Sequence, residues 1–280
     1  MPRTIHLAHS PDSDDAFMFY ALSEGKIATG ELEYVHELCD IESLNQRSRR
    51  GELEVSAVSI HAYSYIADRY ALLSSGSSMG DGYGPRLVAT TSPPDDVPAA
   101  LRGLRVGLPG KLTTAYLVLK LFQPDIEEVM LPFDAIEDAV LDGEVDVGLV
   151  IHEGQLTYQE RGLHLWGDLG EWWQADTGLP LPLGGNVVRR DLGDEVVQQI
   201  AHDLKASIEY GLQHRPDALS HASKFNRGIS ESQTDAFVGM YVNHWTVDYG
   251  ERGREAVRTL LDRAHQAGLI PDRVEVEFVG

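Results

Sequence analysis

One histidine directly follows a strongly apolar stretch near the middle of the chain. Residues 145–151 read VDVGLVI, a composition that indicates a strand buried on both faces, and His152 and Glu153 come next. In open α/β sheets, ligands bind beyond the carboxyl ends of the strands. A histidine there can accept a proton near neutral pH, because its unperturbed pKa is about 6.5. His152 is therefore a candidate general base that Glu153 could orient. The alternative is that His152 only caps the strand through a hydrogen bond to a carbonyl.

A pair of threonines forms the second candidate site. A predicted strand over Leu104–Leu108 and a short turn precede Thr113 and Thr114, and a helix is expected over Ala115–Phe122. The start of a helix exposes backbone N–H groups, which together with two hydroxyl groups would suit a carboxylate. N-capping by one threonine is the alternative, and the two roles are compatible.

Three aspartates lie between the predicted first strand, Ile5–His9, and a predicted helix, Ala16–Ser23. We interpret Asp12, Asp14 and Asp15 as capping groups, because negative charge is favourable at a helix N-terminus. A metal site is the weaker alternative, since no glutamate or glycine completes a calcium-binding loop. No metal is expected.

The chain as a whole is acidic. Its 280 residues carry a formal net charge of −21, and only five of the 23 basic residues are lysines. Such a charge argues against nucleic acid or an anionic membrane as a partner, because no basic stripe offsets the repulsion. An acidic, lysine-poor surface can reflect adaptation to high salt, and an ordinary acidic protein is the alternative. An anionic ligand would need a local group of hydrogen-bond donors.

The cysteine content and the apolar runs bear on location. Cys39 is the single cysteine, which excludes an internal disulfide and fits a reducing compartment. No apolar run approaches the length that spans a bilayer. The first residues lack the apolar segment of an export signal. We therefore expect a cytoplasmic protein.

Strands and helices alternate through residues 1–90, which is the pattern of a parallel sheet. We expect strands over Ile5–His9, Glu31–His36, Leu53–Ser59, Arg86–Thr90, Leu104–Leu108, Val145–Ile151 and Leu163–Trp166, and helices over Ala16–Ser23, Ile41–Arg50, Ile60–Ala67, Ala115–Phe122, Ala135–Leu141 and Asp168–Gln174. We interpret Gly76–Gly84 as a flexible connection and Ser92–Pro98 as a linker. The prolines in Leu179–Gly185 exclude a central strand there, whereas Asn186–Arg190 has extended character.

The last third of the chain is predicted to be helical. Val196, Ile200, Leu204 and Ile208 recur at a spacing of four, which gives one amphipathic face. Capping signals precede three of the predicted helices: Asp40 before Ile41–Arg50, Asp134 with Glu137 at Ala135–Leu141, and Ser230 with Gln233 before a helix that ends near His244. A further helix is expected over Glu251–Ala267, and the alternating tail Val274–Phe278 can add an edge strand.

These elements predict an α/β protein with two lobes. Residues 1–92 and 188–280 would form a larger, discontinuous lobe, and residues 93–187 a smaller one. Pockets favour the interface between such units.

Four groups of residues then stand out along the chain. They are Gly107–Gly110 with Thr113–Tyr116 (GLPG and TTAY), Gly148–Glu153 (GLVIHE), Trp172–Trp173 with Thr177–Gly184 (TGLPLPLG), and Tyr241–Asn243 (YVN). They resemble the motifs of the 1,4-dihydroxy-6-naphthoate synthase family, and the resemblance covers essentially the whole chain.

The resemblance implies a two-lobed, periplasmic-binding-protein-like (type II) fold with a ligand cleft between the lobes. It implies a lyase of the futalosine route to menaquinone, which converts cyclic dehypoxanthine futalosine to 1,4-dihydroxy-6-naphthoate. Its partner would be this small-molecule carboxylate, and no metal or redox cofactor would be needed.

The resemblance also assigns residues to the site. His152 matches the proposed proton acceptor of the family. The expected substrate-binding residues are Ala57, Val58, Ser59, Thr114 and Ala115 from the resemblance, with Thr113 and Asn45 beside them. We expect Ser59, Thr113, Thr114 and His152 to face one cleft.

Two positions depart from the family pattern. Ala57 stands where the family has a lysine, and Asp14 stands where it has an asparagine, so the pocket is more negative than expected. Two alternatives stay open. One is chorismate dehydratase, a sister enzyme of the same fold and pathway. The other is a cytoplasmic protein that binds a small carboxylate without chemistry.

Overall fold

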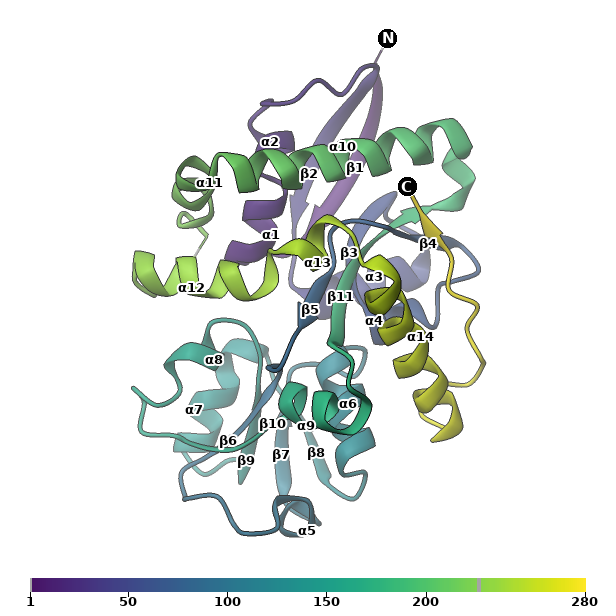
Figure 1. Ribbon diagram of the computed structural model, residues 1–280. Helices are drawn as coiled ribbons and strands as arrows, with labels where there is room; N and C mark the ends of the chain where they lie inside the picture. The colour runs from purple at the N-terminus through teal and green to yellow at the C-terminus, as the bar shows by residue number, and fades with distance from the viewer. Residues whose placement is uncertain (1, 226–227) are drawn as a thin grey trace.

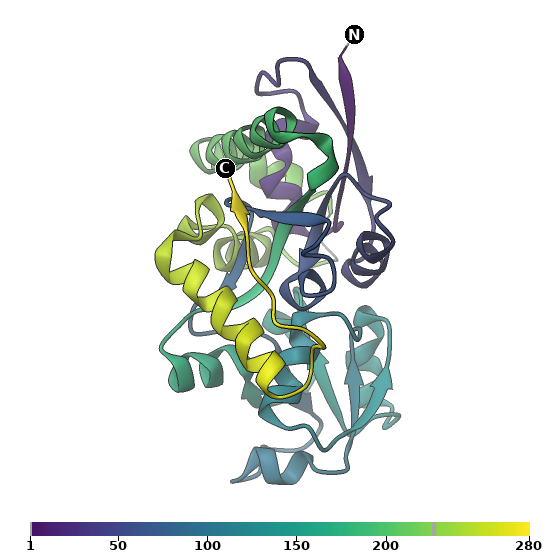
Figure 2. The same ribbon diagram turned by 90° about the vertical axis from the view of Figure 1, so that its right-hand side faces the viewer.

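The computed structural model describes residues 2–225 and 228–280 and has a two-lobed α/β fold. Each lobe is built around one mixed β-sheet, and the two sheets lie one above the other in Figure 1. The N- and C-terminal segments both belong to the upper lobe, whereas the middle of the chain forms the lower lobe (Figures 1 and 2). The predicted fold class is confirmed.

The sheet of the first lobe has the strand order β12-β4-β11-β3-β1-β2, and β5 pairs with β11. Its strands are β1 (Arg3–His9), β2 (Leu32–Leu38), β3 (Val55–Ser59), β4 (Tyr70–Leu73), β5 (Ser78–Gly80), β11 (Leu181–Arg189) and β12 (Phe278–Val279). The parallel arrangement predicted from the N-terminal block is confirmed for β1, β2 and β3. Strand β11 runs antiparallel to β3 and β4, so the sheet as a whole is mixed.

The sheet of the second lobe has the order β10-β6-β9-β7-β8. Its strands are β6 (Arg86–Ala89), β7 (Arg105–Leu108), β8 (Glu127–Met130), β9 (Val147–Val150) and β10 (His164–Asp168). Strand β9 lies between β6 and β7 and is buried along its whole length, as its apolar sequence predicts. The carboxyl end of β9 therefore delivers His152 from the middle of this sheet.

Helices pack on both sheets. The first lobe carries α1 (Ser13–Met18), α2 (Tyr20–Ser23), α3 (Ile41–Arg50), α4 (Ile60–Tyr63), α10 (Asp194–Gln213), α11 (Arg215–Ala222), α12 (Glu231–Tyr241), α13 (His244–Val247) and α14 (Gly250–Gln266). The second lobe carries α5 (Val97–Leu101), α6 (Thr114–Phe122), α7 (Ile136–Leu141), α8 (Gly154–Thr157) and α9 (Leu169–Thr177), with short 3₁₀ turns at Phe133–Ala135 and Arg190–Leu192. The predicted caps at Asp40 and at Ser230 with Gln233 are confirmed.

The capping box predicted at Asp134 and Glu137 is wrong. Asp134 lies in the 3₁₀ turn, and α7 begins after Ala135 without a side-chain cap. Glu137 instead forms an ion pair with Arg161, its carboxylate lying 3.3 Å from the guanidinium. The 3₁₀ turn shifts the start of the helix by one residue, so the two side chains no longer stand in the positions that a capping box requires.

Two predictions about the connecting segments are also wrong. Leu181–Arg189 is a single strand in the middle of the first sheet, although its first part contains a proline. Pro182 is tolerated because only β5 pairs at this level, and the register shifts between Pro182 and Gly184. Residues Ser78–Gly80 of the supposed flexible connection are the paired strand β5.

The segment Ser92–Pro98 joins β6 to α5 within the second lobe. The domain boundaries at residues 92–93 and 187–188 remain a prediction. Strand β6 pairs in the sheet of the second lobe, and β11 pairs in the sheet of the first lobe.

One apolar cluster extends through both lobes. It contains Val58 and Tyr249 of the first lobe together with Leu149 and Trp173 of the second. Leu181, at the start of β11, belongs to the same cluster and is fully buried. The lobes are therefore joined by continuous apolar packing beside the chain crossings, and this packing fixes the strand ends that meet between the sheets.

Candidate active site

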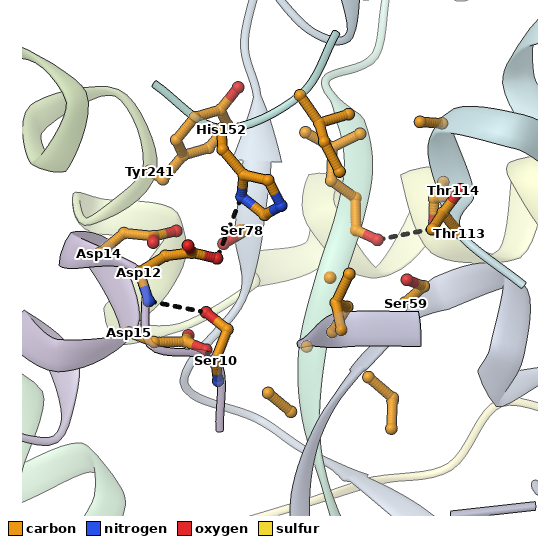
Figure 3. A pocket seen from close by; sticks show the side chains of 18 of the residues that line it. Ser10, Asp12, Asp14, Asp15, Ser59, Ser78, Thr113, Thr114, His152 and Tyr241 are labelled. Carbon is orange, nitrogen blue, oxygen red and sulfur yellow. Dashed lines mark hydrogen bonds and ion pairs between the residues drawn. The ribbon is translucent and has the colours of Figure 1, made fainter. Parts of the chain in front are cut away.

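A cavity lies where strand ends and helix starts from both lobes meet (Figure 3). Its empty volume is about 780 Å³ including the open mouth, which suits a small-molecule ligand. Among the residues that line it are Ser10, Asp12, Asp14, Asp15, Ala57, Val58, Ser59, Ser78, Thr113, Thr114, Ala115, His152, Gln155, Asn186, Phe237 and Tyr241. The expected convergence of Ser59, Thr113, Thr114 and His152 on one cleft is confirmed.

The imidazole of His152 forms an ion pair with Asp12. Nδ1 of His152 lies 3.0 Å from Oδ2 of Asp12, and the other ring nitrogen points toward the cavity (Figure 3). Asp12 occupies the N-cap position of α1, but its side chain makes no capping hydrogen bond. The capping role predicted for Asp12 is therefore wrong. The interaction fixes Nδ1 and leaves Nε2 as the nitrogen that can reach a ligand.

The backbone of His152 is held in an unusual conformation. Its φ is +60°, and no other non-glycine residue among residues 2–225 and 228–280 has a positive φ. In the orientation that satisfies its neighbours, the Gln155 amide donates to the Gly84 carbonyl at 3.0 Å and accepts from the backbone N–H of His152 at 3.3 Å. Left-handed backbone at a non-glycine residue is found preferentially at functional sites.

Burial and charge act in opposite directions on His152. Burial by itself lowers the pKa of this imidazole, but the carboxylates of Asp12, Glu153 and Asp14 outweigh it and raise the pKa above its ordinary value. A higher pKa makes the neutral imidazole a stronger base.

Glu153 does not orient the imidazole. Its carboxylate is buried and accepts a hydrogen bond from the Ser13 hydroxyl at 3.2 Å. Asp15, by contrast, accepts from the backbone N–H of Ser10 at 2.7 Å, and burial raises its pKa to about 6. The orienting carboxylate for His152 thus comes from Asp12 in the N-terminal loop, far away in sequence, rather than from the next residue.

The opposite side of the cavity is formed by the N-terminus of α6 (Figure 3). The Thr113 hydroxyl donates to the Gly110 carbonyl at 2.8 Å and caps the helix by accepting from the Tyr116 N–H at 3.2 Å. The Thr114 hydroxyl donates to the Leu183 carbonyl at 2.6 Å. A hydroxyl has one hydrogen to donate, so neither threonine hydroxyl is free to donate to a carboxylate.

The free donors at this helix start are in the backbone. No acceptor for the N–H of Thr114 or of Ala115 occurs within the part of the chain that the structure describes. These are two of the N–H groups that a helix cannot bond internally, and they suit an anion. The prediction of an anion-facing helix start is thus kept, but with backbone rather than hydroxyl donors.

Ser59 adds a hydroxyl to the same cavity. It ends β3 and lines the cavity together with Thr113 and Thr114 (Figure 3). Asn45 is fully buried on α3 and does not line the cavity; its Nδ2 donates to Ser59 Oγ at 3.0 Å. Ser59 therefore keeps its own hydrogen for a ligand, and Asn45 supports Ser59 instead of lining the cavity.

Several lining residues were not expected from the sequence. They are Ser10, Asp12, Ser78, Gln155, Asn186, Phe237 and Tyr241. The loop from Ser10 to Asp15 did carry a signal, because a polar loop after a first strand lies at the ligand-facing edge of the sheet. Tyr241 is buried, and in the orientation of the Gln155 amide given above its hydroxyl donates to the amide oxygen at 3.1 Å. No sequence pattern links α12 to the loop after β9, so this contact could only be found in three dimensions.

Residues 5–266 match a protein family described by its role in menaquinone biosynthesis. The chain belongs to the menaquinone biosynthesis family. Two curated relatives are both called 1,4-dihydroxy-6-naphthoate synthase. The one from Streptomyces coelicolor is 40% identical over 278 residues, which cover 96% of this chain and 95% of that protein. The one from Thermus thermophilus is 40% identical over 266 residues and covers 95% of each chain.

Two solved structures are similar to this chain. A crystal structure from Archaeoglobus fulgidus has a TM-score of 0.89 and 45% sequence identity, covering 95% of this chain and 98% of that one. The alkanesulfonate-binding protein of Xanthomonas axonopodis pv. citri, solved with bound MOPS, has a TM-score of 0.72 at 14% identity and covers 98% and 96% of the two chains. This second likeness shows the periplasmic-binding-protein fold.

No group of three or more histidine, cysteine, aspartate or glutamate side chains is arranged to hold a metal ion in the ranges 2–225 and 228–280. Within the same ranges, no helix is long and apolar enough to cross a membrane.

Proposed function

We propose that this chain is a 1,4-dihydroxy-6-naphthoate synthase, a lyase of menaquinone biosynthesis that acts on cyclic dehypoxanthine futalosine. The relatives at 40% identity over almost the whole chain support the activity. One observation in the site carries the mechanism: Asp12 holds His152 by Nδ1 at 3.0 Å, beside a cavity whose far side offers free N–H groups.

The substrate carboxylate would bind at the start of α6. The N–H groups of Thr114 and Ala115 and the Ser59 hydroxyl are donors without a protein acceptor in the described chain. Hydrogen bonds from such donors to a charged group are worth about 1.5–3 kcal/mol each. This local set of donors is what an anionic ligand needs in a chain whose net charge is −21.

Binding in this orientation directs the rest of the substrate toward His152. The imidazole lies on the other side of the cavity, with Asp12 behind it and Tyr241 beside it (Figure 3). Nε2 of the neutral imidazole would accept a proton from the substrate, and Asp12 would stabilise the imidazolium that forms. A positioned base of this kind contributes roughly 10²–10⁴-fold to a rate.

Ala57 and Val58 would contact the substrate through van der Waals interactions. Both line the cavity on β3, and neither carries a polar side chain. The reaction would use only the groups of the chain itself, without a cofactor. The proposal also places the enzyme in the cytoplasm, which the single cysteine favours.

The purified protein should release 1,4-dihydroxy-6-naphthoate from cyclic dehypoxanthine futalosine without added metal, as followed by liquid chromatography. His152→Ala is the matched control, and it should bind the substrate but form no product. Chorismate in place of the substrate should be left unchanged. Substrate binding by the wild type without product would contradict the proposal and favour a binding protein of the same fold.

A further inference from the structure

Asp14 is a carboxyl of the cavity that the mechanism above does not use. It is the second residue of α1, lines the cavity and lies beside Asp12 on the side of His152 (Figure 3). The neighbouring carboxylates all have partners: Asp12 pairs with His152, and Glu153 accepts from Ser13. No residue in the described ranges donates a hydrogen bond to Asp14 or forms an ion pair with it.

The groups that face Asp14 are mostly acidic. Asp12 and Asp15 come from its own segment, His152 and Glu153 come from the connection after β9, and Tyr241 comes from α12. Burial, followed by repulsion from Asp15 and Asp12, raises the pKa of Asp14 well above its ordinary value, against the opposing effect of His152. A carboxyl without donors and among carboxylates is more stable in the neutral form, which has an O–H group to donate.

We propose that Asp14 is a second catalytic residue, whose carboxyl O–H donates a hydrogen bond to a substrate oxygen while His152 accepts a proton from the substrate. This inference rests on the proposed function and extends it. The proton moves from the substrate to Nε2 of His152, and the electron pair left behind places negative charge on the oxygen that Asp14 contacts. Asp14 keeps its proton throughout, so the step needs no further reactant. Removing one donor of this kind from other enzymes costs roughly 10²–10³-fold in kcat.

The carboxyl groups of Asp12 and Asp14 have different surroundings and therefore different roles. Asp12 forms an ion pair with His152 through Nδ1, whereas Asp14 forms no ion pair with any residue of the described ranges 2–225 and 228–280. Two carboxyls whose surroundings favour opposite protonation states form an acid–base arrangement. Asp12 is thus a positioning residue, and Asp14 is the one that would touch the substrate.

The test compares Asp14→Asn with Asp14→Ala in steady-state assays from pH 6 to pH 9. The amide of Asn is neutral, has nearly the same shape as the carboxyl group and donates a hydrogen bond. The methyl group of Ala is also neutral but is smaller and has no donor. We expect Asp14→Asn to keep kcat within about threefold of the wild type and to lose the decline at alkaline pH that ionisation of Asp14 causes. Asp14→Ala should lose roughly 100-fold in kcat with a smaller change in KM. Both variants remove the same carboxylate from the neighbourhood of His152, so that effect cancels between them.

Two results would overturn the inference. Wild-type kcat in Asp14→Ala would show that Asp14 is a spectator, and an Asp14→Asn as inactive as Asp14→Ala would show that the ionised carboxylate is required. Infrared difference spectra of wild type and Asp14→Asn give an independent readout, since the wild type should show the C=O band of a protonated carboxyl at pH 7.5. Absence of that band would also overturn it. Failure of the wild type to form product would overturn the proposed function, and this inference with it. If the wild type forms product and Asp14→Ala has the same kcat as the wild type, the inference is overturned and the proposed function is not.

Discussion

Asn45 holds Ser59 at the edge of the cavity through two hydrogen bonds. Its Oδ1 accepts from the Ser59 backbone N–H at 2.9 Å, and its Nδ2 donates to Ser59 Oγ at 3.0 Å. The amide therefore aligns the hydroxyl and occupies one of its lone pairs, so that the O–H bond is left to point elsewhere. Asn45 acts behind Ser59, in a position that a ligand does not reach.

Asn45→Ala should weaken both the fold and substrate binding. The buried N–H of Ser59 would lose its acceptor, which costs about 1–3 kcal/mol of unfolding free energy. KM should rise while kcat changes little, because the carboxylate donor is misplaced but the base is intact. Urea unfolding and steady-state kinetics check the two effects. Ser59→Ala is the matched control, because it should raise KM with a smaller loss of stability. A rise in KM for Ser59→Ala alone would contradict the supporting role of Asn45.

Asp12→Asn should shift the pH profile of the reaction. The carboxylate of Asp12 counteracts the burial of His152 and so contributes to the raised pKa of the imidazole. Without it, the pKa of His152 falls, and the acid limb of kcat/KM moves to lower pH. The rate at pH 8 should also fall, roughly 10–100-fold, because the imidazole is a weaker base and is less well oriented. An acid limb at unchanged pH would show that His152 does not titrate in this reaction.

The strand that carries His152 and the fold around it could be predicted from the sequence. The apolar run 145–151 identified a buried strand, and the cap at Asp40 gave the start of α3. The start of α6 was predicted at Ala115, one residue after its actual start, because the sequence did not show which threonine is the cap. These features depend on neighbours within a few residues. The order of strands in a sheet does not, so the pairing of β11 between β3 and β4 could not be obtained from the prolines of its sequence.

The division of labour at the site depended on long-range contacts. The sequence placed Asp12 in a polar loop, where capping is the common role, but its partner His152 lies in another lobe. The hydroxyl of Thr114 was likewise expected to be free, yet it donates to Leu183 on β11. In both cases the local sequence pattern predicted where the side chain lies, but its partner comes from a segment that is distant in sequence.

Thr114→Pro tests whether backbone N–H groups bind the carboxylate. Proline is tolerated at the first position of a helix, and the preceding Thr113 has φ −69° and ψ 147°, which a following proline allows. The variant lacks the N–H of residue 114 and the hydroxyl. We expect KM to rise roughly 10–100-fold more than in Thr114→Val, which lacks only the hydroxyl. Equal values of KM in the two variants would show that this N–H does not contact the substrate.

The backbone of His152 should store strain that glycine relieves. Glycine adopts a φ of +60° readily, whereas alanine does not. His152→Gly and His152→Ala should both be inactive, and the glycine variant should have an unfolding free energy about 1 kcal/mol higher than that of the alanine variant. Urea unfolding of the two proteins measures this difference. Equal stability would mean that the left-handed conformation is not kept in solution.

Acid should destabilise the protein through the buried pair His9 and His36. Nδ1 of His36 lies 3.3 Å from Nε2 of His9, and burial lowers the pKa of His9 to about 3 and that of His36 to about 4. In the unfolded chain both histidines titrate near pH 6.5. Below about pH 6.5 the unfolded state therefore binds more protons than the folded state, and the free energy of unfolding decreases as the pH is lowered. Each histidine contributes a slope of about 1.4 kcal/mol per pH unit between these limits.

Asp15 acts in the opposite direction in the same pH range. Its folded pKa of about 6 lies above the usual value of 3.8, so the folded state takes up a proton there and gains stability as the pH falls. The stability of the wild type alone therefore cannot isolate the histidines. His36→Gln keeps Asp15, and its stability relative to the wild type should increase steadily as urea unfolding is repeated from pH 7.5 to pH 5. His202→Gln, which removes an exposed histidine from α10, is the matched control. A constant difference for His36→Gln would mean that the pKa of His36 is the same in the folded and the unfolded protein.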